Sequence, residues 1–506
     1  MMHRVLRVPF LLLLAAAAVA QVVPTDVAPT APRQSSAYGN EPIPIVLPIQ
    51  PAAPNLAGLM NAFTAVPPVP GSPIAQAAQT LTDRQLSVTI VGHLGAVQTR
   101  DKSWIVQVPL NGSCQITQIS SSAGPWFAAL NIPGNENTDI HSVVFPLPHS
   151  VVPGDALVAL SGSAGGNSMP AIRFAPTSSA VDEAMAIVFV PYAVSPGLLR
   201  PPALGRRTNP IVHFFRTFGP IPEAMVQLDK LPSVIDLATL PVDWTAWGSY
   251  VPTFQNTLDL WGGGRFCGDL YDGWRAADRV PWTQHQGYGT YYVGAMSTSM
   301  LMLCTTAPVA AKAPLAFALV QNGLDQVGAF ADGRFLYPLG GHCWGRKTPI
   351  VLAGHLMGIE PFLNVSNYVG PQFAEDSLFT TTWWFGGTNW TAGWQFARGE
   401  FNNLPNPPST WGDPNSPSHA TFGWAVAYMG QVVPAQIGTA LAAKLMGYGD
   451  SLNPALIRMV DQFVRGPPPA AIQQLLAAGI APLGWGTDYA VPTGFALQSW
   501  KRYSAP

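Results

Sequence analysis

Charged side chains are scarce in this sequence: lysine, arginine, aspartate and glutamate together make up 10% of its 506 residues. The 25 basic and 27 acidic side chains leave a net charge close to zero, and no long basic block occurs, which argues against nucleic acid as a partner. The shortage of charge does not indicate disorder, because 48% of the residues are apolar and can bury a sizeable core.

Cysteine is also rare, and the common catalytic motifs are missing. The four cysteines include no CxxC pair, so their spacing is not that of a zinc ribbon. One disulfide among Cys267, Cys304 and Cys343 would fit an exported chain, with Cys114 in another domain. The sequence contains no GxSxG elbow, HExxH, P-loop or Rossmann glycine pattern, which argues against a serine hydrolase, a zinc protease and a nucleotide-dependent enzyme.

After its first residues the chain has no uninterrupted apolar run long enough to span a membrane. The start, "MMHRVLRVPFLLLLAAAAVAQ", has two arginines, then a short apolar stretch, then small residues before Gln21. This pattern predicts a secretory signal peptide over residues 1–20, with an uncleaved anchor as the alternative. We therefore expect a protein that is secreted, or held in the periplasm or cell envelope, without stable membrane insertion.

Proline and glycine, by contrast, are abundant, with 51 and 48 residues, and their placement suggests the domain organisation. Residues 21–80 are rich in proline and alanine, which is typical of a linker. Residues 81–200 contain short β-branched runs such as "LSVTIVG" and "AIVFV" between turn signals, which predict an antiparallel β-sandwich. Residues 211–506 contain helical stretches that begin with proline and end with glycine, such as the one expected from Pro314 to Gly328. In "NPALIRMVDQFV", Asn453 is a candidate N-cap and Pro454 the first helical position.

Long aromatic, glycine-rich loops separate these helical stretches, and such loops are usually functional. Helices with aromatic loops between them lead us to infer an (α/α) toroid-like domain. The expected fold class is thus a multidomain α and β protein, with an N-terminal antiparallel β-sandwich followed by the toroid-like helical domain.

The string "GGHCWGRKTPI" lies between two of the expected helices. Pro349 is expected to start a helix, which would place Arg346 and Lys347 just before a helix N-terminus, a position that attracts anions. Arg346 could bind a carboxylate bidentately, and His342 could act as an acid or base near neutral pH. Trp344 is a candidate for substrate contact in the same loop. The alternative is that Arg346 and Lys347 are solvated and His342 only caps a loop.

Other loops supply candidate partners for this string. Tyr288 and Tyr292, in "GYGTYYVG", could provide a phenolate base, although tyrosines at a helix start also serve packing. His285 lies in the same polar loop and is a candidate for substrate binding.

The carboxylates Asp269, Glu375 and Asp376 stand out in a chain this poor in charge. A pair of carboxylates on opposite sides of a sugar is what a glycoside hydrolase needs, whereas pairing with nearby arginines would give them a structural role. Flat aromatic rings can also stack on sugars or fill a core. The clustered tryptophans considered as sugar contacts are Trp383, Trp384 and Trp390.

The segments "AFALVQNGLDQVGAF", "GGHCWGRKTPIVLAGHLMG" and "FAEDSLF" resemble a group of uncharacterised secreted bacterial proteins with a GGHxxGRKxP motif. The resemblance covers roughly residues 250–500, and the group is similar to α/α-toroid carbohydrate-active enzymes, among them polysaccharide lyases. It implies proton transfer by a tyrosine or histidine and an arginine against a uronate carboxylate. His342, Arg346 and Tyr288 or Tyr292 match those roles in residue type.

We therefore expect a secreted carbohydrate-active enzyme that cleaves an acidic, uronate-containing polysaccharide by β-elimination. Arg346 and Lys347 would neutralise the carboxylate, and a tyrosine or His342 would take the C5 proton. A glycoside hydrolase with a carboxylate pair and a non-catalytic glycan-binding or cell-envelope protein are the alternatives. The chemistry requires no cofactor, and calcium held by the acidic loops is the one metal considered.

Overall fold

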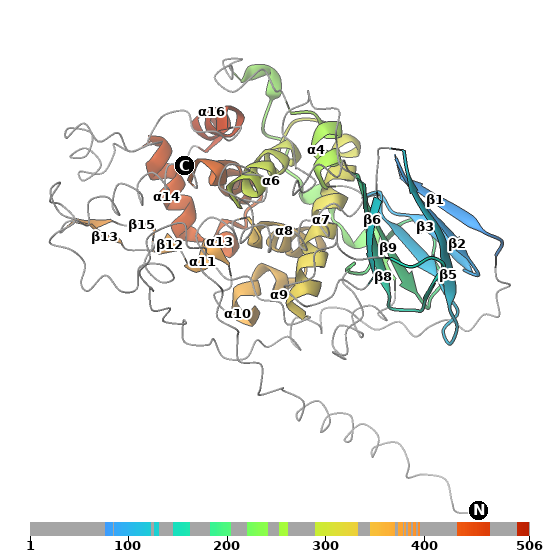
Figure 1. Cartoon of the computed structure of the whole chain (residues 1–506). Coiled ribbons are helices and arrows are strands. Elements are labelled where there is room, and N and C mark those ends of the chain that lie inside the picture. Colours follow the sequence, from blue (N-terminus) through green and yellow to red (C-terminus); the bar gives the residue numbers. More distant parts are fainter. Residues whose placement is uncertain are drawn as a thin grey trace, which may run out of the picture. The chain divides into compact units, whose positions relative to one another are not determined.

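A computed structural model shows strands in the N-terminal region and helices in the C-terminal part, so the chain is a mixed α and β protein (Figure 1). The predicted signal peptide and nearly all of the proline-rich segment lie outside the residues that the structure describes. The described residues are 76–83, 85–122, 126–130, 145–161, 183–203, 220–240, 252–261, 289–331, 345–369, 373–377, 379–380, 383–385, 388–390, 393–394, 433–465 and 493–504.

The first sheet is antiparallel and has the strand order β1-β2-β5-β7. Along β2, residues Leu86, Val88 and Ile90 are fully buried while those between them are partly exposed, as expected for a strand that covers a core with one face. The strands of this sheet are β1 (Gln79–Asp83), β2 (Leu86–Val91), β5 (Cys114–Ser121) and β7 (His149–Val151).

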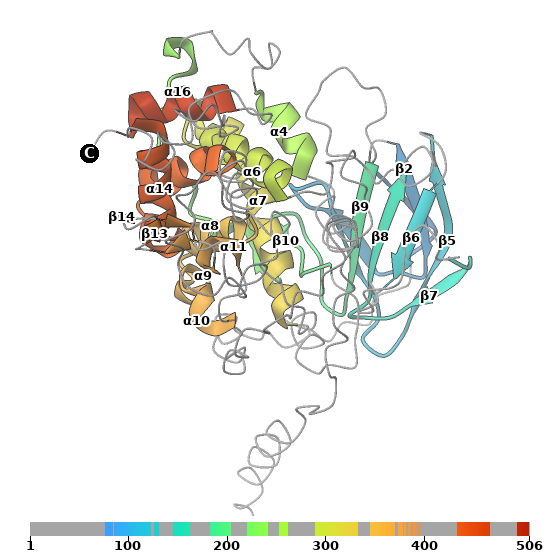
Figure 2. The ribbon, with the colours of Figure 1, turned by 60° about the vertical axis from the view of Figure 1, so that its left-hand side comes forward.

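The second sheet has the order β3-β4-β9-β8-β6, and Figure 2 shows β9, β8 and β6 as adjacent arrows. Its pairs are antiparallel except for β4 with β9, which run parallel. This exception was not expected; β4 and β9 are far apart in the chain and are not joined by a hairpin. The strands are β3 (Gly95–Gln98), β4 (Trp104–Gln107), β6 (Trp126–Leu130), β8 (Ala156–Ser161) and β9 (Glu183–Val190).

Strand β9 is buried on both faces. Met185, Ile187 and Phe189 belong to a hydrophobic cluster that also contains side chains of the first sheet. The alternate residues Ala186 and Val188 belong to a separate cluster. Because successive side chains point to opposite faces, the continuous apolar run "AIVFV" follows from this double burial.

The C-terminal part is built around three apolar helices, α6 (Gly289–Leu303), α7 (Val309–Ala331) and α8 (Lys347–Met357). None of the described helices is long and apolar enough to cross a membrane. The other helices are α4 (Phe254–Trp261), α9 (Glu360–Leu363), α10 (Val365–Val369), α11 (Ala374–Ser377), residues 433–445, α13 (Gly449–Leu452), α14 (Pro454–Arg465) and α16 (Thr493–Tyr503).

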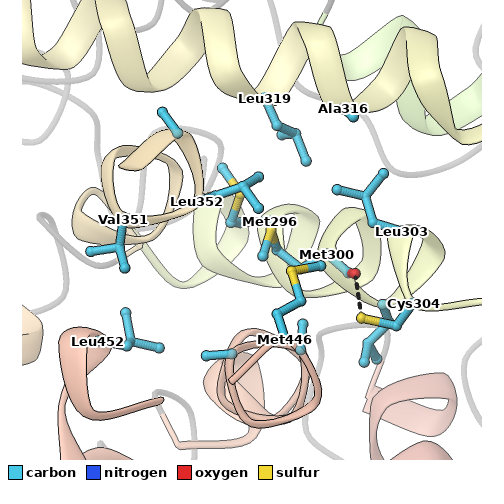
Figure 3. Packing of buried hydrophobic residues seen from close by; sticks show 14 of the residues in the cluster. Met296, Met300, Leu303, Cys304, Ala316, Leu319, Val351, Leu352, Met446 and Leu452 are labelled. Atoms are coloured by element: carbon cyan, nitrogen blue, oxygen red, sulfur yellow. Dashed lines mark hydrogen bonds between the residues drawn. The ribbon is translucent and has the colours of Figure 1, made fainter. Parts of the chain in front are cut away.

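Most of these helices share one hydrophobic cluster, which Figure 3 shows in part. There, Met296 and Leu303 of α6 lie among side chains of neighbouring helices, including Leu319 and Leu352. Cys304 is buried here as a free thiol and donates a hydrogen bond to the Met300 carbonyl. A disulfide that includes Cys304 is therefore not formed. Burial also raises the pKa of this thiol well above its usual range.

Two helix boundaries differ from the sequence prediction. Helix α7 begins at Val309 and contains Pro314, so the expected start at Pro314 was wrong. Helix α8 begins at Lys347, with Arg346 as its N-cap, and Pro349 lies inside its first turn. Proline is tolerated in a first turn because the N–H groups there have no intrahelical partner.

The central helices approach each other closely at glycines. A Cβ atom on Gly323 of α7 would lie 2.3 Å from the carbonyl oxygen of Pro349 in α8. A Cβ atom on Gly438 would lie 2.6 Å from the carbonyl oxygen of Ser297 in α6. Glycine is thus required at both positions by contact between backbones, which no larger residue permits.

A buried ion pair joins Arg200, which follows β9 in the chain, to Asp325 of α7. Both terminal nitrogens of the Arg200 guanidinium donate to the Asp325 carboxylate, at 2.5 and 2.6 Å. The Gln321 side chain, one helical turn earlier, bonds the backbone N–H and carbonyl of Arg200. Asp101, in the turn between β3 and β4, lies 3.8 Å from the Arg200 Nε atom. All of these side chains are at most 2% exposed, so solvent does not weaken the pair.

The neighbouring Arg100 makes a second link from the same turn. Its Nε atom lies 2.7 Å from the Glu223 carboxylate, and its guanidinium carbon lies 5.2 Å from the centre of the Phe317 ring in α7. Burial raises the pKa of Glu223, and Arg100 opposes that rise. The turn between β3 and β4 therefore contacts α7 directly through Arg100, while Asp101 lies against the Arg200 side chain that binds α7.

We expect Gly323→Ala to lower the free energy of unfolding by about 2 kcal/mol, because overpacking against Pro349 outweighs the roughly 1 kcal/mol that alanine gains in a helix. Urea unfolding measures this difference. Gly95→Ala is the control, since its Cβ would meet Val194 at an ordinary 3.5 Å. Equal stability of the two variants would contradict the close contact of α7 with α8.

We expect Asp325→Asn to destabilise the protein by about 3–5 kcal/mol, because it removes the bidentate countercharge of the buried Arg200 guanidinium and leaves only Asp101 among the described acids, at 3.8 Å. Asp461→Asn is the matched control: Asp461 pairs with Arg465 at 3.5 Å, but both side chains are exposed, at 49% and 36%. That control should change stability by less than about 1 kcal/mol. Similar losses in both variants would show that the buried pair contributes no more to stability than the exposed pair.

Candidate functional site

The structure describes the side chains of Arg346, Lys347, Glu375 and Asp376, and it brings these sequence-predicted residues together at the start of α8. Tyr292 lies in the first turn of α6, as expected for the start of an apolar helix. The other predicted residues, apart from the tryptophans described below, lie outside the described part of the chain: Asp269, His285, Tyr288, His342 and Trp344.

A glycine turn sets up the site. Gly345 has φ +80°, a left-handed conformation that glycine adopts without strain, and it directly precedes the N-cap Arg346. The Gly345 N–H donates to Oε1 of Glu375 at 2.7 Å. We call the set formed by residues 345–347 and 375–376 the α8 corner.

Lys347 binds partners inside the protein. Its Nζ atom donates to Oδ1 of Asp376 at 2.6 Å and to the carbonyl oxygen of Leu452, the last residue of α13, at 2.7 Å. Asp376 also accepts a hydrogen bond from the Ser366 hydroxyl of α10. The anion expected at this helix start is therefore supplied by the chain itself, as Asp376.

Arg346 and Lys347 are not solvated, because their exposed fractions are only 2% and 5%. The alternative in which both side chains point into solvent is wrong. Their burial follows from the helix boundary: Lys347 is the first residue of α8, whose described residues are almost all buried. A cation in such surroundings acts more strongly on a nearby anion than one at the surface.

Glu375 is fully buried and connects three segments. Its side chain holds Gly345, and its backbone carbonyl accepts a 2.6 Å hydrogen bond from the amide of Asn453, just before α14. Its second oxygen, Oε2, is buried and has no hydrogen-bond partner among the described residues. These contacts fit the structural role that was considered for Glu375, except that its partner is a backbone N–H rather than an arginine.

Burial raises the pKa of Glu375 to about 7 from its usual value near 4.5. The neighbouring Asp376 carboxylate raises it further, while Lys347 and the Gly345 N–H oppose the rise. The neutral form of Glu375 is therefore favoured to higher pH than that of an exposed glutamate.

The tryptophan-rich segment follows α11 directly and forms short antiparallel ladders. Trp383 is paired with Trp390, and Trp384 with Asn389. The strands are β12 (Phe379–Thr380), β13 (Trp383–Phe385), β14 (Thr388–Trp390) and β15 (Gly393–Trp394).

Three residues of the site were not identified from the sequence: Ser366, Leu452 and Asn453. Asn453 was expected only as the N-cap of α14, which does begin at Pro454. Its bond to Glu375 joins residues that are far apart in the chain, and no local pattern indicates such a contact. The bond from Lys347 to Leu452 uses a backbone carbonyl, which carries no residue-type signal at all.

Among the described residues, no group of three His, Cys, Asp or Glu side chains is placed to hold a metal ion. In comparisons with protein-family models, curated proteins and solved structures, no family, relative or fold neighbour matched this chain. The resemblance of residues 250–500 to toroid carbohydrate-active enzymes therefore stays a prediction from the sequence.

We expect Lys347→Met to lower the free energy of unfolding by about 2 kcal/mol, because Asp376 loses its countercharge and the Leu452 carbonyl loses its donor. Chemical unfolding followed by circular dichroism measures the loss. Lys501→Met, which changes an exposed lysine in the last turn of α16, should change stability by less than about 0.5 kcal/mol. A Lys347 variant as stable as this control would contradict the internal role of the ammonium group.

Proposed function

We propose that this chain is a secreted carbohydrate-active enzyme that cleaves an acidic, uronate-containing polysaccharide by β-elimination. Its finer architecture would be a β-sandwich followed by an α/α toroid. The hydrophobic cluster that the two sheets share supports a β-sandwich. The apolar helices that pack into one core are compatible with a toroid.

The observation that carries the proposal is the buried anchoring of the α8 corner. Gly345 is held by Glu375, and Lys347 by Asp376, directly after the sequence "GGHCW". His342 is three residues from Gly345, so covalent geometry keeps its Cα atom within about 11 Å of this anchor. Arg346 is thus held at this anchor, and an imidazole precedes it by only a few residues in the chain.

In the proposed reaction, Arg346 binds the uronate carboxylate, assisted by the N–H groups of the first turn of α8. Neutralising that carboxylate acidifies the C5 proton, which His342, Tyr288 or Tyr292 removes. The electron pair from the C5–H bond forms the C4–C5 double bond, the C4–O bond breaks, and the leaving oxygen takes up a proton. Preorganised positive charge opposite the developing enolate supplies most of the stabilisation.

The contacts of Lys347 favour a role different from the one expected for it. Since its ammonium group already binds Asp376 and Leu452, Lys347 holds the α8 corner in place rather than contacting substrate. Asp376 has the same positioning role. Rigid support of this kind is what places a catalytic group accurately against its substrate.

Glycoside hydrolysis is the second candidate, and the pKa of Glu375 favours it. A carboxyl group with a pKa near 7 can donate a proton to a leaving glycosidic oxygen at neutral pH. In the described structure, however, Glu375 is fully buried and one of its oxygens already binds Gly345. We therefore rank this reaction second.

Incubating the mature protein with acidic and neutral polysaccharides tests the proposal, by following near-ultraviolet absorbance together with new reducing ends. We expect both signals to rise on a uronate polymer, and to fall by about a hundredfold or more in His342→Ala and Arg346→Ala. Lys501→Met should retain the wild-type rate. Reducing ends without absorbance would show hydrolysis, while binding without either signal would show a non-catalytic glycan-binding protein.

A further inference from the structure

An exposed turn of the N-terminal region carries the sequence Asn-Gly-Ser at residues 111–113, which has the Asn-X-Ser/Thr pattern of an N-glycosylation acceptor. The turn joins β4 of the second sheet to β5 of the first. It is closed by a hydrogen bond of 3.0 Å from the Gly112 N–H to the carbonyl oxygen of Pro109. Asn111 and Ser113 are both exposed. The amide and the hydroxyl group that define the pattern are therefore both at the surface.

The turn is anchored at both ends, so the exposure of its tip is a fixed feature of the fold. On one side, the Val108 N–H donates to the carbonyl oxygen of Val190 in β9 at 2.8 Å. On the other side, Cys114 is buried and is paired with Val151 of β7. Short, anchored turns of this kind present their tip residues to enzymes that act on the protein surface.

The preceding residue, Leu110, gives a second and independent observation. Its side chain is 53% exposed, more than any other large apolar side chain in the described part of the chain. A leucine in this position leaves apolar surface in water, and a bulky sugar on the adjacent residue can cover that surface. A glycan on Asn111 would therefore find a contact surface on the protein next to its point of attachment.

The sequence at residues 364–366 has the same pattern but different surroundings. The Asn364 amide donates to the Glu360 carboxylate, and the Ser366 hydroxyl donates to the carboxylate of Asp376. The two groups that a glycosyl transferase must engage are thus bound inside the protein at this second sequence. A third such sequence, at residues 389–391, extends beyond the described residues.

We propose that Asn111 is an N-glycan acceptor and that the attached sugar lies over Leu110. The transfer joins Nδ2 of Asn111 to C1 of the first sugar of an oligosaccharide, whose donor in the export pathway is a polyprenyl diphosphate. The C1–O bond to the diphosphate breaks, its electron pair stays on the diphosphate oxygen, and the amide nitrogen loses one proton. The modification depends on the predicted export of the chain and is independent of the proposed cleavage reaction.

Peptide mapping by mass spectrometry tests the acceptor, on the full chain secreted from eukaryotic cells. An amidase that releases N-glycans converts each modified asparagine to aspartate, which marks its position. We expect this conversion at Asn111 and complete loss of that glycan in Asn111→Gln and in Ser113→Ala, which removes only the hydroxyl group. Ser113→Thr keeps the pattern and should keep the glycan. An unconverted Asn111 in the secreted wild type would overturn the proposal.

Asn367→Gln is the matched control for these variants. Asn367 is an exposed asparagine of α10, but it lies in no Asn-X-Ser/Thr sequence. Its replacement should leave the glycan on Asn111 unchanged. Loss of the glycan in this control as well would show that the variants act through export or folding, and the assignment to Asn111 would fail.

Methyl NMR of the glycosylated chain with labelled leucine tests the contact with Leu110. The Leu110 signal, assigned by its absence in Leu110→Ile, should shift when the glycan is removed. The signal of Leu445, which packs against the core of the helices, should stay in place. If the Leu110 signal does not move, the sugar does not lie over this side chain and that part of the proposal is wrong.

The glycan and the proposed reaction can fail separately. If Asn111 carries a glycan and no polysaccharide is cleaved, the modification stands and the reaction fails. If cleavage occurs and Asn111 is bare, the reaction stands and the modification is wrong.

Discussion

The bidentate ion pair between Arg200 and Asp325 is the interaction that positions α7, the longest of the central helices. It fixes the chain leaving the second sheet against one face of α7, and Gln321 holds the backbone of the same arginine. Gly323 lies between these two polar residues in sequence and touches the Pro349 carbonyl of α8. The turn of α7 that binds the arginine therefore also sets the position of α8, and with it the position of the α8 corner.

Buried charge is managed differently at the two ends of this arrangement. Arg200 and Asp325 neutralise each other, so the pair is stable at any pH where both are charged. At the corner, Lys347 and Asp376 do the same, and the buried carboxyl group of Glu375 accepts the Gly345 N–H beside them. The first arrangement is a pair of opposite charges, whereas burial raises the pKa of Glu375 and so favours its neutral form. A chain with so few charges places several of them where water is excluded.

Much of the coarse fold could be predicted from local patterns. Short β-branched runs between turn signals indicated strands, and apolar stretches ending at glycine indicated helices. The start of α14 at Pro454 was also predicted, whereas α7 began before Pro314, because tertiary packing extends a helix past a local start signal. The residues of "GRK" and "AED" were both singled out for their charge. A structural pairing of these carboxylates with nearby arginines, Arg346 among them, was considered, but Lys347 as the partner of Asp376 was not foreseen. A carboxylate and a lysine 29 residues apart carry no information on which ion each will bind.

By itself, the sequence determined which residues carry charge in an apolar chain, where turns interrupt the strands and helices, and that His342 precedes the start of α8 by a few residues. These features depend on composition and local spacing. Only the tertiary structure decided that Lys347 is buried against Asp376 and Leu452, and that the Glu375 carboxyl group is shielded from water with a raised pKa. Burial and countercharge come from segments distant in the chain, so the ionisation of a side chain is a property of the packed molecule.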